Sequence, residues 1–165
     1  MSVTLHTTLG DIKIEIYWDQ VPLAAKNFLA LCASGYYDGV KFHRNIRGFV
    51  IQTGDPTGTG RGGESIYGNP FQDEIRPELK HSTRGILSMA NSGPNTNKSQ
   101  FFLTYSRQSH LNGKNTVFGK VISGLEVLDL MENQPNMEGT HTPRNDILIN
   151  SVTIHSNPIA EQESS

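Results

Sequence analysis

The chain has 165 residues, a formal net charge of −2 and a single cysteine, Cys32, and its pI is near 6.3. A near-neutral chain without a block of Lys or Arg lacks the electrostatic footprint of a protein that binds nucleic acid or an anionic membrane directly, and one cysteine excludes an internal disulfide. With no apolar run near the ~20 residues of a membrane span and no signal-peptide pattern, we expect a protein of the nucleus or cytoplasm. We also expect a monomer, in which Cys32 is a small buried side chain.

The first elements predicted along the chain are a hairpin and a helix. Residues 3–7 and 12–17 alternate apolar and polar side chains on either side of a Gly-Asp turn, which is typical of two paired strands. Pro22 then occupies a position that the first turn of a helix tolerates, and apolar residues follow at helical spacing until Gly35. This pattern predicts an amphipathic helix of about three turns.

Short apolar segments divided by loops rich in glycine and asparagine predict the remaining strands. These segments are residues 41–43, 49–52, 86–90, 101–104, 117–122 and 147–154. A second helix is predicted after Ser123, because Ser123 and Glu126 have the spacing of a capping box, and Pro135 would end it. About eight short strands with two helices favour a mainly β fold, an antiparallel barrel or sandwich. We expect one domain over residues 1–156, followed by a polar, frayed tail at residues 157–165.

Arg44 is the first candidate for chemistry. It leaves a predicted strand in Phe-His-Arg-Asn-Ile (residues 42–46), beside the segment Gly-Phe-Val-Ile-Gln-Thr-Gly-Asp (residues 48–55). On spacing alone, an arginine in this position is more often a surface salt-bridge partner than a catalytic group. The glycine-rich segment 54–63 lacks the Gly-Lys-Ser/Thr ending of a phosphate-binding loop, and no pair among the six histidines has metal-ligand spacing. These patterns predict neither a nucleotide site nor a metal site.

Four segments further along carry a resemblance to a known family. They are Gly-Ile-Leu-Ser-Met-Ala-Asn-Ser-Gly-Pro-Asn-Thr-Asn at residues 85–97, Ser-Gln-Phe-Phe at 99–102, Leu-Asn-Gly-Lys at 111–114 and Val-Phe-Gly-Lys-Val at 117–121. Together with the segments around Arg44 they resemble the signature strings of the cyclophilins, and the resemblance runs from about residue 5 to residue 154. It implies a closed eight-stranded antiparallel β-barrel capped by two α-helices. It also implies an enzyme that catalyses cis-trans rotation of peptide bonds before proline, with no cofactor and no metal.

The resemblance implies roles for individual residues. Arg44 matches the catalytic arginine, and Gln52 matches the glutamine that holds it in place. The residues that match the walls of the proline pocket are Phe49, also counted with the catalytic residues, Val50, Phe102 and Leu111. The residues that match the adjoining substrate groove are Gly60, Ala90, Asn91 and Gln100, with the Asn91 backbone gripping the main chain of the substrate. Without the resemblance, the apolar wall residues would be interpreted as ordinary core.

Three positions depart from the most familiar family members. His110 stands where a tryptophan is usual, Asn115 where a histidine is usual and Val50 where a methionine is usual. His110 and Asn115 are still assigned to the substrate site, His110 as a solvated rim residue without a chemical role of its own. Loss of the indole at this rim predicts weak binding of cyclosporin. Loss of an aromatic lid at Asn115 predicts a weaker grip on the substrate.

Within the family, the first seven residues and residues 152–155 are most similar to the nuclear, single-domain peptidyl-prolyl isomerase-like 3 group. That similarity implies proline-containing peptides or proteins as substrates, with spliceosomal proteins as further partners. Two functions therefore stay open. The first is an active isomerase that assists folding or conformational switching, and the second is a proline-binding module of a larger assembly such as the spliceosome, with incidental catalysis. Retention of Arg44, Gln52 and Phe102 favours the active enzyme.

Overall fold

The opening hairpin forms as its alternating pattern predicts, in a computed structural model that describes residues 1–156. Strand β1 (Ser2–Thr7) pairs antiparallel with β2 (Gly10–Ile16), and Leu5 lies opposite Ile12. Both side chains are fully buried, whereas the residues that alternate with Ile12 along β2 keep some exposure. The hairpin therefore turns one apolar face toward the core.

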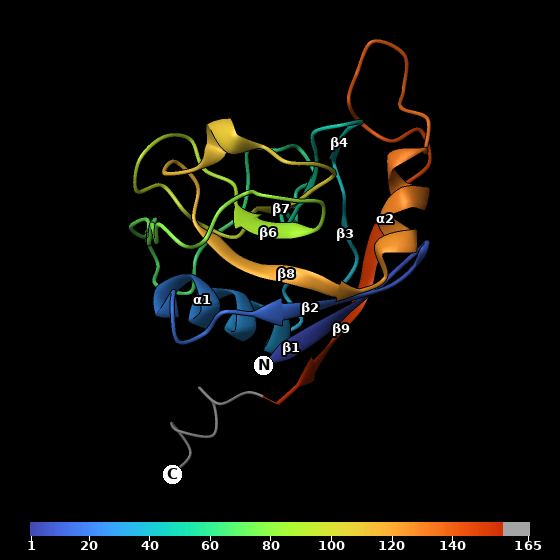
Figure 1. The fold of residues 1–165 in the computed structure, drawn as a ribbon. Coiled ribbons are helices and arrows are strands. Elements are labelled where there is room, and N and C mark those ends of the chain that lie inside the picture. The colour runs from blue at the N-terminus through green and yellow to red at the C-terminus, as the bar shows by residue number, and fades with distance from the viewer. Residues whose placement is uncertain (157–165) are drawn as a thin grey trace.

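Nine strands form one antiparallel sheet (Figure 1). After the hairpin they are β3 (Val40–Lys41), β4 (Arg44–Ile46), β5 (Val50–Thr53), β6 (Ile86–Met89), β7 (Phe101–Thr104), β8 (Val117–Ser123) and β9 (Leu148–His155). Their order across the sheet is β3-β9-β1-β2-β8-β6-β7-β5-β4. The helices are α1 (Pro22–Ala33), α2 (Leu125–Glu132) and a short 3-10 helix, η1 (Ser109–Leu111). The first predicted helix is thus confirmed, with proline in its first turn.

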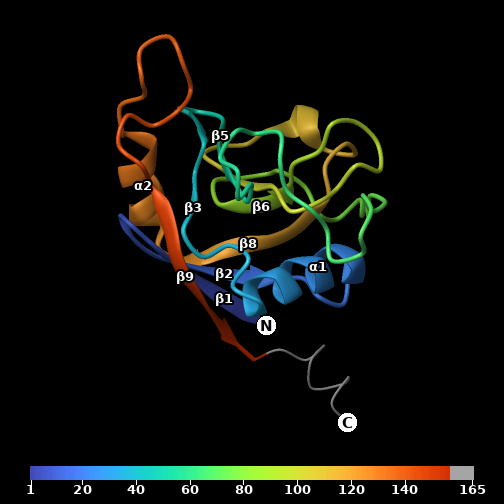
Figure 2. The ribbon, with the colours of Figure 1, turned by 180° about the vertical axis from the view of Figure 1, so that it is seen from behind.

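The sheet is curled, because the two strands at its ends, β3 and β4, follow each other directly in the sequence. β3 and β4 stand at opposite ends of the strand order, yet only Phe42 and His43 separate them, and Figure 2 shows β3 beside β9. Of the strand expected at residues 41–43, only Lys41 lies in a strand, at the end of β3. The buried Phe42 donates its backbone N–H to Ile147 O, next to β9, and the chain then passes through His43 to β4. The expected eight-stranded barrel is a curled sheet of nine strands, and its ladder does not continue from β3 to β4.

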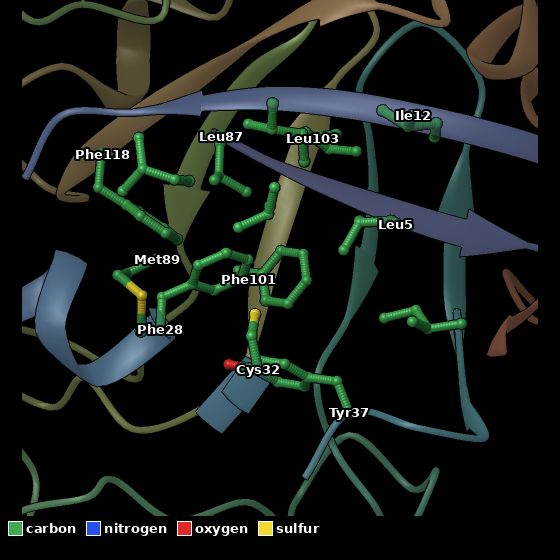
Figure 3. Close-up of a cluster of buried hydrophobic side chains, with 14 of the residues drawn as sticks. Leu5, Ile12, Phe28, Cys32, Tyr37, Leu87, Met89, Phe101, Leu103 and Phe118 are labelled. Atoms are coloured by element: carbon green, nitrogen blue, oxygen red, sulfur yellow. The ribbon is translucent and has the colours of Figure 1, made fainter. Parts of the chain in front are cut away.

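Phe28 on α1 ties the helix to the interior of the curled sheet (Figure 3). Its ring centroid lies 5.1 Å from that of Phe101 on β7 and 5.2 Å from that of Phe118 on β8, both in edge-to-face arrangements. Such pairs contribute about 0.5–1.5 kcal/mol each beyond the burial of their area. Cys32, one turn further along the helix, is buried in the same cluster, as expected for a small apolar side chain.

The capping box predicted for α2 is wrong. Ser123 is the last residue of β8 and pairs with Lys13, so Gly124 takes the N-cap position, with a φ of 102°. An L side chain rarely adopts this left-handed conformation, which explains a glycine here. The helix ends at Glu132, three residues before Pro135, and its buried face consists of Val127, Leu128 and Met131.

Three long loops gather on one side of the sheet, at the left of Figure 1. They connect β5 to β6, β6 to β7 and β7 to β8, and they carry most of the residues that the resemblance places in the site. Within residues 1–156, no helix is long and apolar enough to cross a membrane. The tail expected at residues 157–165 lies outside the described part of the chain.

Candidate functional site

Strand register places a row of side chains across the outer face of the curled sheet. Arg44 on β4 lies opposite Gln52 on β5, Gln52 lies opposite Phe102 on β7, and Phe102 lies opposite Ser88 on β6. Side chains alternate between the two faces of a strand, and Leu103, which follows Phe102, is fully buried in the core. The row therefore points away from the core and brings together residues that are up to 58 positions apart in sequence, the separation of Arg44 and Phe102.

A chain of side-chain hydrogen bonds orients the guanidinium of Arg44. Arg44 Nη1 donates to Gln52 Oε1 over 3.3 Å, and Gln52 Nε2 donates to Gln100 Oε1 over 2.9 Å. Gln100 Nε2 in turn donates to the carbonyl oxygens of Gly60, at 3.0 Å, and Gly62, at 2.9 Å. The exposed arginine is thus tied through two amides to the backbone of the β5–β6 loop.

Aromatic side chains flank the arginine on its other side. The Arg44 Cζ atom lies 6.0 Å from the centroid of the Phe49 ring. The Phe49 ring stacks on the imidazole of His110, with centroids 5.7 Å apart and planes inclined by 27°. Phe49 is half-buried and His110 is exposed, so the imidazole forms the solvent-facing rim of this aromatic pair.

Phe102 is supported from behind by a buried histidine that the sequence did not single out. The His81 ring stacks on Phe102 with centroids 6.0 Å apart and an angle of 19° between the planes. His81 Nδ1 lies 2.9 Å from Asn112 Oδ1, an acceptor, and Nε2 lies 2.8 Å from Ser88 Oγ. Burial lowers the pKa of His81, although its hydrogen bond to Asn112 acts in the opposite direction. A neutral imidazole at pH 7 therefore holds the ring of Phe102 in place.

A groove of about 420 Å³ adjoins the arginine. The predicted residues that line it are Gln52, Gly60, Ala90, Asn91 and Gln100. Its other lining residues, which the sequence did not single out, are Arg61, Gly62, Pro70, Ser92, Thr96 and Lys98. The predicted residues outside this lining are Arg44, Phe49, Val50, Phe102, His110, Leu111 and Asn115. The structure thus divides the predicted set into a polar groove and an adjacent, largely apolar face.

Val50, Leu111 and Asn115 are predicted site residues that lie outside the groove lining. Val50 is 1% exposed, so it offers almost no surface to a ligand. Leu111 is half-buried at the end of η1. Asn115 Nδ2 donates to Met89 O over 2.9 Å, which ties the β7–β8 loop to β6. Asn115 is therefore engaged in a structural hydrogen bond.

Asp55 organises the β5–β6 loop from within. Its carboxylate is fully buried and accepts hydrogen bonds from the backbone N–H groups of Thr57, at 2.9 Å, Gly60, at 2.7 Å, and Gly62, at 3.1 Å. Burial alone would raise the pKa of Asp55, but the hydrogen bonds outweigh it and lower this pKa to about 2. Sequence reasoning rejected this loop as a phosphate site and assigned its Gly60 to the substrate groove, but it did not single out Asp55. One acidic residue, Asp55, among several glycines was the sequence feature that could have indicated a loop folded around a carboxylate.

The arrangement suits a reaction that needs a fixed positive charge beside an apolar surface. No group of three His, Cys, Asp or Glu side chains within residues 1–156 could hold a metal ion. A charged donor next to Phe49 can stabilise a developing acceptor on a bound ligand.

Comparisons with known proteins agree with this chemistry. The model of the cyclophilin type peptidyl-prolyl cis-trans isomerase/CLD family matches residues 2–154. A peptidyl-prolyl cis-trans isomerase of Arabidopsis thaliana is 67% identical, over 97% of this chain and 99% of its own length. The human peptidyl-prolyl cis-trans isomerase-like 3 is 62% identical, over 98% of this chain and 100% of its own length.

A solved structure supports the same relationship. The cyclophilin type peptidyl-prolyl cis-trans isomerase of Cryptosporidium parvum, crystallised in the presence of the dipeptide Ala-Pro, superimposes with a TM-score of 0.92 and 56% sequence identity. The match covers 95% of this chain and 100% of that structure.

Proposed function

This chain belongs to the cyclophilin-type peptidyl-prolyl cis-trans isomerase family, so it catalyses rotation about X-Pro peptide bonds, and we propose that Arg44 is the residue that stabilises the transition state. The observation that carries the proposal is the hydrogen-bond chain from Arg44 through Gln52 to Gln100, which holds a charged donor beside Phe49. Proline-containing peptide segments are the substrates that this site would take.

The chemistry of amide rotation explains why an arginine is suitable. The C–N bond has partial double-bond character, which gives a rotational barrier of about 18–20 kcal/mol. In the twisted transition state the nitrogen lone pair leaves conjugation and becomes a hydrogen-bond acceptor. A guanidinium directed at this nitrogen therefore binds the transition state more strongly than either planar ground state, and it stays charged at any working pH.

The arginine needs help from the apolar face. A charge-assisted hydrogen bond of about 1.5–3 kcal/mol corresponds to a rate increase of roughly 10- to 150-fold. Phe49 and Phe102 would contribute further by clamping the proline ring while the preceding carbonyl group swings, and by excluding water that stabilises the planar amide. No bond is made or broken, so no nucleophile or proton shuttle is required.

An isomerisation assay on X-Pro peptides tests the proposal. We expect Arg44→Ala to lower kcat/KM at least about tenfold with little change in Tm, because the side chain is exposed and serves the transition state rather than the core. Arg47→Ala is the matched control, since Arg47 is exposed, lies three residues away and donates to Asn133 Oδ1. Equal rates for wild type and Arg44→Ala would refute the assignment and would favour a proline-binding module.

A further inference from the structure

The groove beside Arg44 carries an unbalanced positive charge. Its lining includes two cationic side chains, Arg61 and Lys98, and no aspartate or glutamate. Both cationic residues are exposed, and they come from different loops, β5–β6 and β6–β7. The chain as a whole has a net charge of −2, so this groove differs in sign from the molecule around it.

Neither cation is neutralised by a neighbour in the described part of the chain. The Arg61 guanidinium and the Lys98 ammonium have no hydrogen-bond or ion-pair partner within residues 1–156. Arg84, in contrast, is paired with both Asp129 and Glu132. An arginine and a lysine that converge on one groove without a carboxylate form a site suited to an anion.

Two acidic residues lie close to the groove. The carboxylate of Asp55 is buried behind the lining residues Gly60 and Gly62, whose backbone N–H groups donate to it, so it is not open to a ligand. The second is Glu64. Glu64 and Lys98 both line a second, shallower depression of about 260 Å³ next to the groove. Glu64 is exposed and forms no ion pair with Lys98. Its carboxylate weakens the positive potential at that end without occupying it.

The groove is continuous with the reaction site. Gln52 and Gln100 line it, and the same two amides hold the guanidinium of Arg44. A peptide whose X-Pro bond lies at Arg44 therefore extends its neighbouring residues toward the cations. An extended chain advances about 3.3–3.6 Å per residue, so a side chain within three residues of the bond can span such a groove.

We propose that Arg61 and Lys98 select peptide substrates that carry an anionic side chain, a carboxylate or a phosphate, within three residues of the X-Pro bond. This inference rests on the proposed function, because Arg44 marks where the bond lies. The same groove also contains the Ser92 hydroxyl and the Asn91 amide, which donates only one of its two N–H groups to Lys114 O, whereas the Thr96 hydroxyl already donates to Gly93 O. Arginine and lysine both bind carboxylates and phosphates through charge-assisted hydrogen bonds.

A peptide scan with the wild-type protein is the first part of the test. Glutamate and glutamine are compared at each of the three positions on either side of an Ala-Pro bond, and phosphoserine is compared with serine at the same positions. At one position we expect kcat/KM to be about threefold to tenfold higher for Glu than for Gln at low ionic strength, the size of one or two exposed ion pairs. This ratio should fall as salt screens the charges. A gain with phosphoserine but not with glutamate would identify phosphate as the anion.

Variants connect the preference to the two cations. Arg61→Gln combined with Lys98→Gln should bring the Glu-over-Gln ratio to one. Lys120→Gln removes the same charge from an exposed position on β8, outside the groove, and should keep the ratio. Glu64→Gln should raise the ratio, because it removes the opposing carboxylate.

Two results would overturn the inference. One is the absence of any preference for an anion at all six positions, and the other is a preference that survives in the double variant. Turnover of the uncharged Ala-Pro peptide tests the proposed function separately. If that turnover is absent, NMR titration of the Glu and Gln peptides still decides the inference, since equal affinities would contradict it.

Discussion

Arg44 can stabilise a transition state only if its guanidinium is held in one orientation. Fixing a long arginine side chain costs up to about 2 kcal/mol of rotamer entropy. The bond to Gln52 and the contact with the Phe49 ring offset part of this cost before the substrate arrives. Gln52 is itself fixed by Gln100, so we expect it to act as a positioning residue for Arg44.

We predict that His110 affects the binding of cyclosporin more than the binding of proline peptides. Its imidazole is exposed and stacks on Phe49, where a tryptophan would present a larger apolar face and an indole N–H. We predict that His110→Trp increases cyclosporin affinity by roughly 30- to 1,000-fold, the equivalent of about 2–4 kcal/mol for one hydrogen bond and part of an aromatic contact. Titration calorimetry of both proteins measures this difference, while an isomerisation assay should show only a modest change in turnover. Tight binding of the drug by the wild-type protein would rule the prediction out.

The β5–β6 loop helps to fix the orientation of the Arg44 side chain through hydrogen bonds. The Asp55 carboxylate accepts hydrogen bonds from the backbone N–H groups of Gly60 and Gly62. The carbonyl groups of the same two glycines accept hydrogen bonds from Gln100 Nε2. A Cβ atom at Gly62 would collide with the Asp55 carboxylate, so only glycine allows this close approach. The loop is thus a framework that connects a buried acid to the reaction site.

Asp55→Asn should reveal this framework through the pH dependence of stability. The pKa of Asp55 in the folded protein is about 2, below its ordinary value in an unfolded chain. A depressed pKa means that its stabilisation is complete above the unfolded pKa and is lost as the pH falls through the folded value. We therefore expect Asp55→Asn to have a lower Tm than wild type at pH 6–7, and the gap to shrink toward pH 2. Thermal unfolding across this range measures the gap, and a gap that stays constant or widens in acid would contradict the role of the ionised carboxylate.

Gly124 makes the transition from β8 to α2. Its φ of 102° is unfavourable for other residues, and a Cβ atom there would collide with Asp11 O and approach Ile12 Cα to 3.0 Å. We predict that Gly124→Ala lowers the free energy of unfolding by more than about 2 kcal/mol, from backbone strain and steric overlap together. Gly139→Ala is the matched control, because Gly139 has a φ of 75° but open space around it. Urea unfolding should show a smaller loss for this control, and equal losses would mean that close packing at Gly124 is unimportant.

At the scale of the whole molecule, the sequence predicts elements better than the contacts between them. Alternation along β2 and helical spacing along α1 are local patterns, and both elements formed where expected. Ser123 and Glu126 matched a helix cap, but pairing with Lys13 draws Ser123 into β8. Tertiary pairing overrode local propensity at that position.

The same limit applies to the site. Family resemblance indicated Arg44 and Gln52, and strand register places them opposite each other. It did not indicate His81, which becomes a support for Phe102 only because two distant loops converge behind β7. The sequence also did not predict that Arg61 and Lys98 share a groove, because only the folded loops bring them together.

We infer that one face of β7 serves stability and the other serves catalysis, and variants of two adjacent residues test this inference. Phe101 packs edge-to-face on Phe28, at 5.1 Å, and on Tyr37, at 5.3 Å, inside the core. Phe102 is also buried, at 4% exposed, but it lies outside that cluster, stacks on His81 and stands opposite Gln52, the hydrogen-bond partner of Arg44. We predict that Phe101→Leu lowers the free energy of unfolding by about 1–3 kcal/mol, from the loss of two aromatic pairs, and changes kcat/KM little. Phe102→Leu should cost less stability and lower kcat/KM about fivefold, the loss of roughly 1 kcal/mol of apolar contact with proline.

Urea unfolding and the isomerisation assay on both variants give the comparison. A larger loss of activity in Phe101→Leu than in Phe102→Leu would show that the two faces do not divide stability from catalysis in this way.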